Sequence, residues 1–290
     1  MNGSALKSAL IMLCASALIV SCAPEMGEPE NSASPLRVRL MSAEQYSNTL
    51  EHVFGKDVSD SVLPPLPPFT RTDGLLSSGA AFVGVTSDQA QQIQQAAASV
   101  AEKVVDETHR DYLLACEPVS EKEADSTCAA QVLKEIGRLL YRRPLNETKV
   151  SHLLEVAEAG ANDAEDFYVG LAIAIETLMI GPEAIFIVDV AEPDPSNPGE
   201  ERLDAFSIAS RLSFFLWNSP PDDALLRAAE SGELHTVDGL AKSVDRMLAS
   251  SRIEDGVRAF FDDMMGFDDF GSLAKDPVVY PMVTGATLAD

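Results

Sequence analysis

The sequence predicts an all-α protein, a multi-helix orthogonal bundle with irregular connections rich in proline and glycine. Apolar residues recur at three- and four-residue spacing through most of the chain after residue 36, as they do on the buried face of an amphipathic helix. Capping residues precede these stretches, and glycine or proline follows them. No segment of any length alternates apolar with polar residues, which is the pattern of a half-buried strand.

The first expected helix spans residues 43–54. Ser42 and Gln45, three residues apart, match a capping box, in which each side chain satisfies a backbone N–H of the other residue. Gly55 then ends the helix, because glycine is common just past a helix C-terminus. Residues 57–86 hold a proline run and several glycines, so we expect an irregular segment there.

Further helices are expected up to residue 190. One begins at Ser87 and runs to about Ala115, where Cys-Glu-Pro breaks it. Residues 164–180 are nearly all apolar, so we expect this helix at the centre of the core. Residues 183–190 continue as a short helix or an extended run. The inward-facing residues expected in the central helix are Phe167, Leu171, Ile173, Ala174, Ile175 and Leu178. The remaining helices of this part span residues 124–141 and 146–159.

An acidic, proline-rich linker at residues 191–201 separates two expected helical modules, residues 36–190 and 202–290. In the second module, Ser219 is expected to cap a helix that carries prolines in its first turn and ends at Gly232. The other expected helices are 204–217, 237–248 capped by Thr236, and 252–265 capped by Ser251.

The chain begins with a segment typical of exported proteins. Lys7 precedes an apolar run at residues 9–20. That run is shorter than the roughly 20 residues that a transmembrane helix needs, so residues 1–21 are expected to be a signal peptide. The run ends in Ile-Val-Ser followed by Cys22, which resembles the lipobox of bacterial lipoproteins, where the cysteine thiol receives a diacylglyceryl group. An ordinary secreted protein with a chance cysteine at this place is the alternative.

Residues 22–35 are acidic and rich in proline and serine, so we expect a flexible tether. The resemblance to lipoproteins implies more than one acyl chain on Cys22, which is what stable membrane attachment requires. Ala23 stands where an aspartate would resemble a signal for retention in the inner membrane. We therefore expect a lipid-anchored protein of the cell envelope, at the outer membrane rather than the inner one, on its periplasmic or surface face.

The four cysteines divide into two groups. Cys14 would be removed with the expected signal peptide, and Cys22 would be acylated. Cys116 and Cys128 remain, and an even pair in an exported chain predicts a disulfide, which stabilises a loop of this length by roughly 3 kcal/mol. Two free buried thiols are the alternative.

The charge balance is strongly acidic, with 46 Asp and Glu residues against 21 Lys and Arg, a net charge of −25. This excludes a nucleic-acid partner, whose phosphates need a basic surface. The acidic excess most simply keeps an exported domain soluble, and binding of a cation or cationic polymer is the alternative. Asp262-Asp263 and Asp268-Asp269 match no calcium loop. The four histidines stand singly, so we expect no metal site.

Three segments resemble one family. Residues 39–50 (Arg-Leu-Met-Ser-Ala-Glu-Gln-Tyr-Ser-Asn-Thr-Leu) resemble its opening signature, and residues 139–145 resemble its Tyr-Arg-Arg-Pro motif. Residues 209–223 (Ala-Ser-Arg-Leu-Ser-Phe-Phe-Leu-Trp-Asn-Ser-Pro-Pro-Asp-Asp) are the best match. The family is the set of uncharacterised, multidomain exported proteins of planctomycete and myxobacterial type, whose central module is the domain of unknown function fifteen-ninety-two.

The resemblance implies export, and in many members a c-type haem motif. This sequence contains no Cys-x-x-Cys-His, so no cofactor is expected in this chain. It resembles an N-terminal portion of the family, with the second module truncated at Asp290. Haem c is then expected only in a missing C-terminal part or on a protein partner.

No catalytic constellation is recognisable: the sequence has no Gly-x-Ser-x-Gly, no phosphate-binding glycine loop and no His-Glu-x-x-His. Arg211, Trp217, Asp222 and Asp223 form the one cluster that we single out, as a pocket rim or docking surface. The alternative, which we favour, is a helix-turn-helix corner in which Trp217 packs, Asp222 caps a helix and Arg211 pairs with an acid.

Arg142 and Arg143 follow the helix expected at residues 124–141. They either bind an anion or satisfy the carbonyls at the helix C-terminus, which we favour. Two function hypotheses follow. In the first, the chain is a membrane-anchored envelope lipoprotein that acts as a non-catalytic helical binding or assembly module. In the second, it is the N-terminal part of a c-type haem redox protein whose haem-binding segment lies elsewhere.

Overall fold

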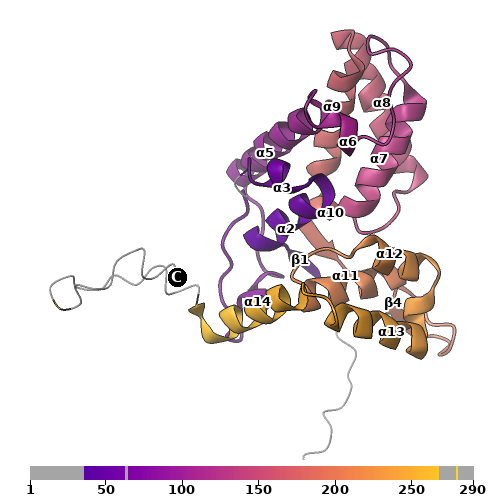
Figure 1. Ribbon diagram of the computed structural model, residues 1–290. Coiled ribbons are helices and arrows are strands. Elements are labelled where there is room, and N and C mark those ends of the chain that lie inside the picture. Colours follow the sequence, from indigo (N-terminus) through magenta and orange to yellow (C-terminus); the bar gives the residue numbers. More distant parts are fainter. Residues whose placement is uncertain (1–35, 63–64, 268–278, 280–290) are drawn as a thin grey trace, which may run out of the picture. The chain divides into compact units, whose positions relative to one another are not determined.

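The computed structural model of this chain describes residues 36–62, 65–267 and 279. Within them the chain forms thirteen α-helices, one 3-10 helix and two two-stranded sheets (Figure 1). The predicted all-α class is confirmed, since the strands have only three residues each. None of the described helices combines the length and hydropathy needed to cross a bilayer. The expected signal peptide, Cys14, Cys22 and the tether at residues 22–35 lie outside the described residues.

The elements follow one another in this order along the chain. The first half contains β1 (Val38–Leu40), α2 (Ala43–Phe54), α3 (Lys56–Ser59), α4 (Leu76–Gly79), α5 (Ser87–Val105), α6 (Arg110–Leu113), α7 (Ser126–Leu140), α8 (Glu147–Ala164), α9 (Phe167–Met179), α10 (Pro182–Ile185) and β2 (Phe186–Val188). The rest contains β3 (Ala191–Pro193), β4 (Glu201–Leu203), α11 (Ala205–Leu216), α12 (Asp223–Glu230), η1 (Glu233–His235), α13 (Val237–Leu248) and α14 (Ile253–Met265).

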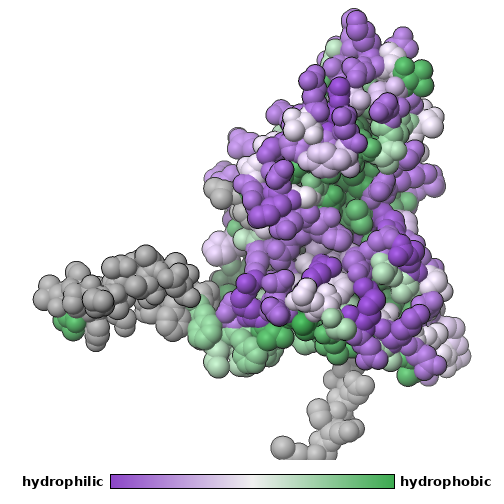
Figure 2. Space-filling view, in the orientation of Figure 1, coloured by the Kyte–Doolittle hydropathy of each residue, from purple (hydrophilic) through white to green (hydrophobic). Residues whose placement is uncertain are grey.

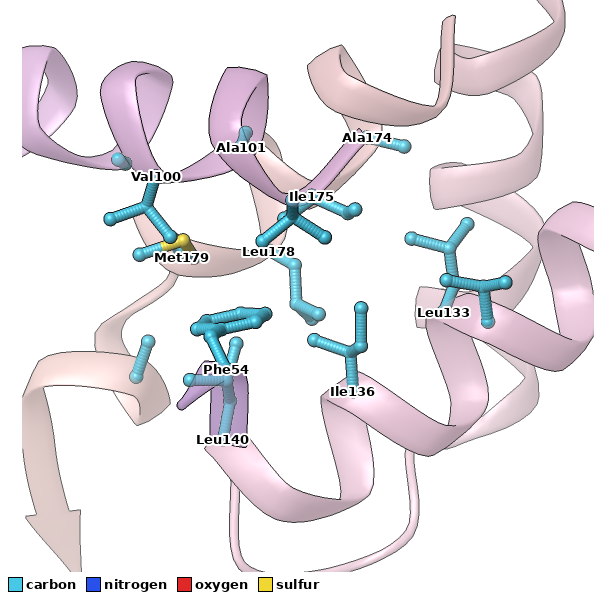
Figure 3. Close-up of a cluster of buried hydrophobic side chains, with 14 of the residues drawn as sticks. Phe54, Val100, Ala101, Leu133, Ile136, Leu140, Ala174, Ile175, Leu178 and Met179 are labelled. Atoms are coloured by element: carbon cyan, nitrogen blue, oxygen red, sulfur yellow. The ribbon is translucent and has the colours of Figure 1, made fainter. Parts of the chain in front are cut away.

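Helix α9 lies at the centre of the larger hydrophobic core, as predicted for residues 164–180. It packs against α5, α7 and α8. Figure 3 shows its side chains meeting Phe54 of α2 and Ile136 of α7. Ile173, which was expected to face inward, is 40% exposed because it lines an open cleft. The most deeply buried α9 residues are Leu171, Ala174, Ile175, Leu178 and Met179.

Helices α8 and α9 approach each other closely because Gly170 has no side chain. A Cβ at this position would lie 2.2 Å from the carbonyl oxygen of Ala157 and 2.5 Å from the backbone nitrogen of Ala161. The pair therefore depends on glycine here, since interiors are too densely packed to absorb such an overlap.

Two small sheets form in parts of the chain for which no strand pairing was predicted, although residues 183–190 were expected as a short helix or an extended run. β1 pairs antiparallel with β2, with Val38 opposite Val188. β3 pairs antiparallel with β4, with Ala191 opposite Leu203, so the segment expected as a linker at residues 191–201 folds back as a hairpin. Three-residue strands are too short to show a period of two, which is why the sequence did not predict them.

A second, smaller core forms where α11 packs against α12, α13 and α14. It is built from Ala205, Ala209, Trp217, Leu225, Ala229, Leu234 and Met247. A third cluster contains Met41, Ile187 and Phe214, so it joins α11 to the β1–β2 sheet.

The predicted extent of the helix from Ser87 to Ala115 is wrong, since α5 ends at Val105. The carboxylate of Asp106 accepts hydrogen bonds from the backbone N–H groups of Thr108 and His109, which follow it in the chain. These bonds turn the chain before the short α6 begins. Such local bonds compete with the helical ladder, and sequence periodicity does not reveal them.

Two predicted N-caps are also wrong. Asp222 caps α12 by accepting the N–H of Leu225, whereas Ser219 lies outside the helix. Ser251 does not cap α14, which has no side-chain cap. Two other predictions are confirmed: the capping box of Ser42 and Gln45 at α2, and the cap of Thr236 on α13.

The predicted disulfide between Cys116 and Cys128 is present, with the two Cα atoms 5.6 Å apart. Cys128 is buried in the first turn of α7 and belongs to the larger core. The bond therefore ties the segment after α6 to α7.

Candidate functional site

The cluster singled out around Trp217 is a closed corner of the smaller core. Trp217 is only 1% exposed, so it offers no surface to a partner. Its indole N–H donates to the carbonyl oxygen of Met247 at 3.0 Å. The guanidinium groups of Arg252 and Arg246 lie over its ring, 4.1 and 5.5 Å from the ring centre, and such cation–π contacts stabilise a buried aromatic ring. Trp217 is therefore packed in a corner between helices, as the favoured alternative predicted.

Asp222 is committed to the same corner. Its two carboxylate oxygens accept hydrogen bonds from Arg246 at 2.7 and 3.0 Å, and one of them also caps α12. Burial alone would raise the pKa of Asp222, but the hydrogen bonds from Arg246 and Leu225 outweigh it, so its pKa is lowered. Asp223 is half exposed and pairs with Arg138 of α7 at 2.8 Å. These acids hold elements together, since Asp222 joins α12 to α13 and Asp223 joins α12 to α7.

Arg211 reaches away from this corner. It donates two hydrogen bonds to Asp189, from Nε at 3.1 Å and from Nη2 at 2.6 Å. The side chain of Asp189 is 1% exposed, so this is an inner ion pair beside β2. The four predicted site residues are therefore divided between two places: Trp217, Asp222 and Asp223 near α12, and Arg211 near the β1–β2 sheet.

Arg142 and Arg143 both make contacts within the fold. Arg142 is 3% exposed and has a left-handed backbone with φ of 58°. It donates to three carbonyl oxygens, those of Leu140, Glu183 and Phe186, each at 2.7 Å. Arg143 pairs with Asp204 at 2.8 Å. We favoured a role for these arginines in satisfying the carbonyls at the end of α7. That role is confirmed for Arg142.

Asp263, one of the acids considered for calcium, accepts hydrogen bonds instead. Its carboxylate receives the backbone N–H groups of Leu76 and Ser77 at 2.6 and 3.0 Å and the guanidinium of Arg71 at 3.1 Å. Asp268 and Asp269 lie outside the described residues. Among the residues that the structure describes, no group of three His, Cys, Asp or Glu side chains is placed to hold a metal ion.

A cleft of about 550 Å³ opens between α5, α6 and α9. Within it Arg110 lies over the ring of Tyr168, 4.2 Å from its centre, and pairs with Glu121 at 3.3 Å. The cleft is negatively charged, but its acids do not gather into a set of metal ligands. The acidic residues that line it are Glu102, Asp106, Glu107, Glu121, Asp166 and Glu176.

The clearest exposed apolar surface lies on α14. Its members follow the spacing i, i+3, i+4, i+7, i+8, which is the stripe of an amphipathic helix that normally faces a core, yet here it faces solvent. Figure 2 shows green and pale green side chains along this helix. We call these five residues the apolar face of α14. They are Val257 (48% exposed), Phe260 (48%), Phe261 (44%), Met264 (44%) and Met265 (58%).

The opposite side of α14 is fixed firmly to the fold, so the exposed stripe is held in place. Gly256 packs against α11 so closely that a Cβ would lie 2.0 Å from the carbonyl oxygen of Leu216. At the other end, the bonds of Asp263 to Arg71, Leu76 and Ser77 attach the helix to the segment around α4. The sequence predicted this helix but not its exposure, because a stripe that faces solvent and a stripe that faces a core look alike in a sequence.

Comparison with known proteins identifies three modules. Residues 39–106 match PSD3, a protein of unknown function (DUF1587), residues 128–189 match PSD5, a protein of unknown function (DUF1595), and residues 203–290 match PSD4, a protein of unknown function (DUF1592). No curated protein and no solved structure matches the chain. The modules occur in the order that the three sequence segments suggested. This chain therefore belongs to the family of proteins of unknown function that combine DUF1587, DUF1595 and DUF1592 modules.

Proposed function

We propose that this chain is a lipid-anchored module of the bacterial cell envelope that binds a partner protein through the apolar face of α14 and catalyses no reaction itself. The observation that carries the binding role is the exposed stripe on α14. The anchor is supported by the lipobox-like segment that ends in Cys22.

The size of the stripe suits the centre of an interface. A large aromatic side chain covers about 150–250 Å², so five large apolar residues that are about half exposed present roughly 400 Å² together. That area lies in the range of roughly 300–600 Å² of the largest apolar patch on a typical monomer, which is often functional. It is about half of the roughly 800 Å² that each partner contributes to a standard protein interface.

Charge indicates which partner fits. Helix α14 carries four carboxylates and one arginine, in a chain of net charge −25. Arg258, the one arginine, already pairs with Glu44 and Asp255. A second copy of the chain would bring the same carboxylates against this helix, and like charges at an interface are unfavourable. The partner that we propose is a helix whose apolar stripe is bordered by lysine and arginine.

The binding role is tested with a synthetic helical peptide that has a leucine stripe flanked by lysines, and with its counterpart flanked by glutamates. We expect the lysine peptide to bind the full chain and to lose most of its affinity for the double variant Phe260→Ser, Met264→Ser. The matched control is Phe215→Ser, because Phe215 is 67% exposed on α11, outside the stripe. If the peptide bound only because it is cationic and the protein is acidic, all variants would bind it with equal affinity. That outcome would refute the role of α14.

The anchor has a separate test. Radiolabelled palmitate is expected to enter the wild-type chain in cells and to be absent from Cys22→Ala. Equal labelling of both chains would contradict the anchor and leave the α14 proposal untouched. Whether the partner carries c-type haem, as the family resemblance implies, is read from a Soret band in the purified complex.

A further inference from the structure

None of the residues that line the cleft between α5, α6 and α9 belongs to α14, so the proposed function does not use this cleft. Its volume of about 550 Å³ lies in the range of roughly 300–1,000 Å³ that is usual for small-molecule sites. Helices α5 and α9 pack side by side and line it with small and branched apolar side chains (Figure 1). We call these the apolar floor: Ala98, Ala101 and Val105 of α5, and Val169, Ala172 and Ile173 of α9.

The floor includes an exposed face of a helix that is apolar around almost its whole circumference. Helix α9 is of this kind, and such helices are normally buried on all sides. In this fold α5, α7 and α8 cover most of α9, but Val169 and Ile173 remain 43% and 40% exposed in the cleft. The exposed face suits a ligand with aliphatic groups that can cover it.

The acidic residues of the cleft are spread along its length. Asp166 lies at the N-terminus of α9 and Glu176 ten residues later, a separation of roughly 15 Å along the helix axis. Glu102 of α5 and Glu107 just after it also line the cleft. Among the described residues no three acids lie close enough together to hold a metal ion. Charges spaced in this way suit several linked cationic groups better than one compact ion.

One cation of the chain itself already lies in the cleft. The guanidinium of Arg110 is 4.2 Å from the ring centre of Tyr168, and it pairs with Glu121 at 3.3 Å. Both residues are part of the cleft wall. This end of the cleft therefore holds a cationic group against an aromatic ring, a contact that is favourable for other cations as well.

The remaining carboxylates keep the capacity to accept hydrogen bonds. Asp106 uses Oδ1 for its bonds to two backbone N–H groups and to the ring of His109, and Asp166 uses Oδ1 to cap α9. In the described part of the chain no donor reaches Oδ2 of either residue, and none reaches Glu102 or Glu107. The cleft thus combines an apolar floor with carboxylates that the chain does not neutralise.

We propose that this cleft binds a linear polyamine, in which methylene segments link several ammonium groups. The methylene segments cover the apolar floor, and the ammonium groups pair with the carboxylates along it, so that the charges of ligand and cleft are complementary. An extended aliphatic chain advances roughly 3.5 Å for every three bonds, so a tetraamine of about thirteen bonds spans roughly 15 Å. That length matches the separation of Asp166 from Glu176 along α9.

The test measures binding of spermine, a tetraamine, to the full chain by calorimetry at constant ionic strength. We expect the double variant Glu102→Gln, Glu176→Gln to bind spermine about tenfold more weakly than the wild type. The matched control is Glu135→Gln, Glu155→Gln, which removes two exposed carboxylates from α7 and α8 and has the same net charge. Mg²⁺ and tetralysine are comparison probes, because the first has charge without a chain and the second carries its charge on a peptide.

Spermine binding that weakens in the cleft variant and not in the control supports the site. Absence of binding, undiminished binding by the cleft variant, or equal weakening in both double variants overturns it. Tighter binding of Mg²⁺ or tetralysine than of spermine, dependent on the same two carboxylates, contradicts the polyamine assignment. Thermal unfolding of the ligand-free variants checks that each is folded. Should the cleft variant lose its fold, Glu102→Gln alone takes its place, and undiminished spermine binding by that variant also overturns the site.

Discussion

Replacement of Arg142 by methionine is expected to be among the most damaging single changes in this fold. The guanidinium donates three hydrogen bonds of 2.7 Å to carbonyl oxygens at the end of α7, in α10 and in β2. It also lies over the ring of Phe214 of α11, 5.8 Å from its centre. One side chain thus joins three elements of the larger core to the helix that begins the second part of the chain.

The magnitude follows from two opposing effects. Hydrogen bonds from a charged donor contribute about 1.5–3 kcal/mol each, and their loss leaves three carbonyl oxygens without this donor. Methionine also removes a buried charge, and the desolvation cost that disappears with it is several kcal/mol. We therefore expect a net loss of about 4 kcal/mol in the free energy of unfolding, which lowers the Tm of a chain of this size by roughly 12 °C.

The assay is thermal and urea unfolding followed by circular dichroism at 222 nm, with Arg143→Met as the matched control. Arg143 is the next residue, but its side chain is 27% exposed and makes an ion pair with Asp204, so its replacement should cost about 1 kcal/mol. A Tm for Arg142→Met within about 3 °C of wild type, or an equal loss for the two variants, would refute the structural role assigned to Arg142.

Three further outcomes are expected. Cys116→Ser removes the shift on a non-reducing gel and lowers stability by roughly 3 kcal/mol, whereas an unchanged gel would contradict the disulfide. The lowered pKa of Asp222 stabilises the fold above the unfolded pKa of about 4 and loses this effect as pH falls further. The stability difference between wild type and Asp222→Asn should therefore shrink below pH of about 4, and a constant difference down to acid unfolding would refute this assignment. Gly170→Leu should separate α8 from α9 and lower the Tm, while Gly84→Leu, at a position with open space, serves as the comparison for which a smaller loss is expected.

The sequence predicted those parts of the fold that depend on local patterns. The apolar stretch at residues 164–180, the capping box at Ser42 and the cap at Thr236 each combine periodicity with a local hydrogen bond. Each of them is confirmed. The pairing of Cys116 with Cys128 followed from counting the cysteines of a chain that is expected to be exported.

The features that the sequence missed depend on contacts between distant residues. β1 and β2 are 3 residues long and pair across most of the first module, so neither one is visible alone. Asp106 turns the chain through hydrogen bonds that its carboxylate accepts from the backbone N–H groups of Thr108 and His109, in a stretch that otherwise looks helical. Arg37 and Asp189, which flank the paired residues of β1 and β2, are brought together by that pairing.

The candidate surface was missed for a different reason. Trp217 was singled out with Arg211, Asp222 and Asp223 as a pocket rim or docking surface, but the sequence of this cluster does not distinguish a buried ring from an exposed one. The stripe of α14 has the spacing of a core-facing helix, and only its surroundings in three dimensions leave it exposed. Burial of one stripe and exposure of another is decided by tertiary packing.

The most direct test of the central claim is photo-crosslinking in living cells from a photoreactive residue at position 260 in place of Phe260, with Phe215 replaced in the same way as the control. The proposed function predicts an adduct at position 260 alone, joined to a partner peptide in which an apolar stripe is bordered by lysine and arginine. Absence of an adduct at position 260, an equal adduct at position 215, or an adduct to a second copy of the chain would contradict it.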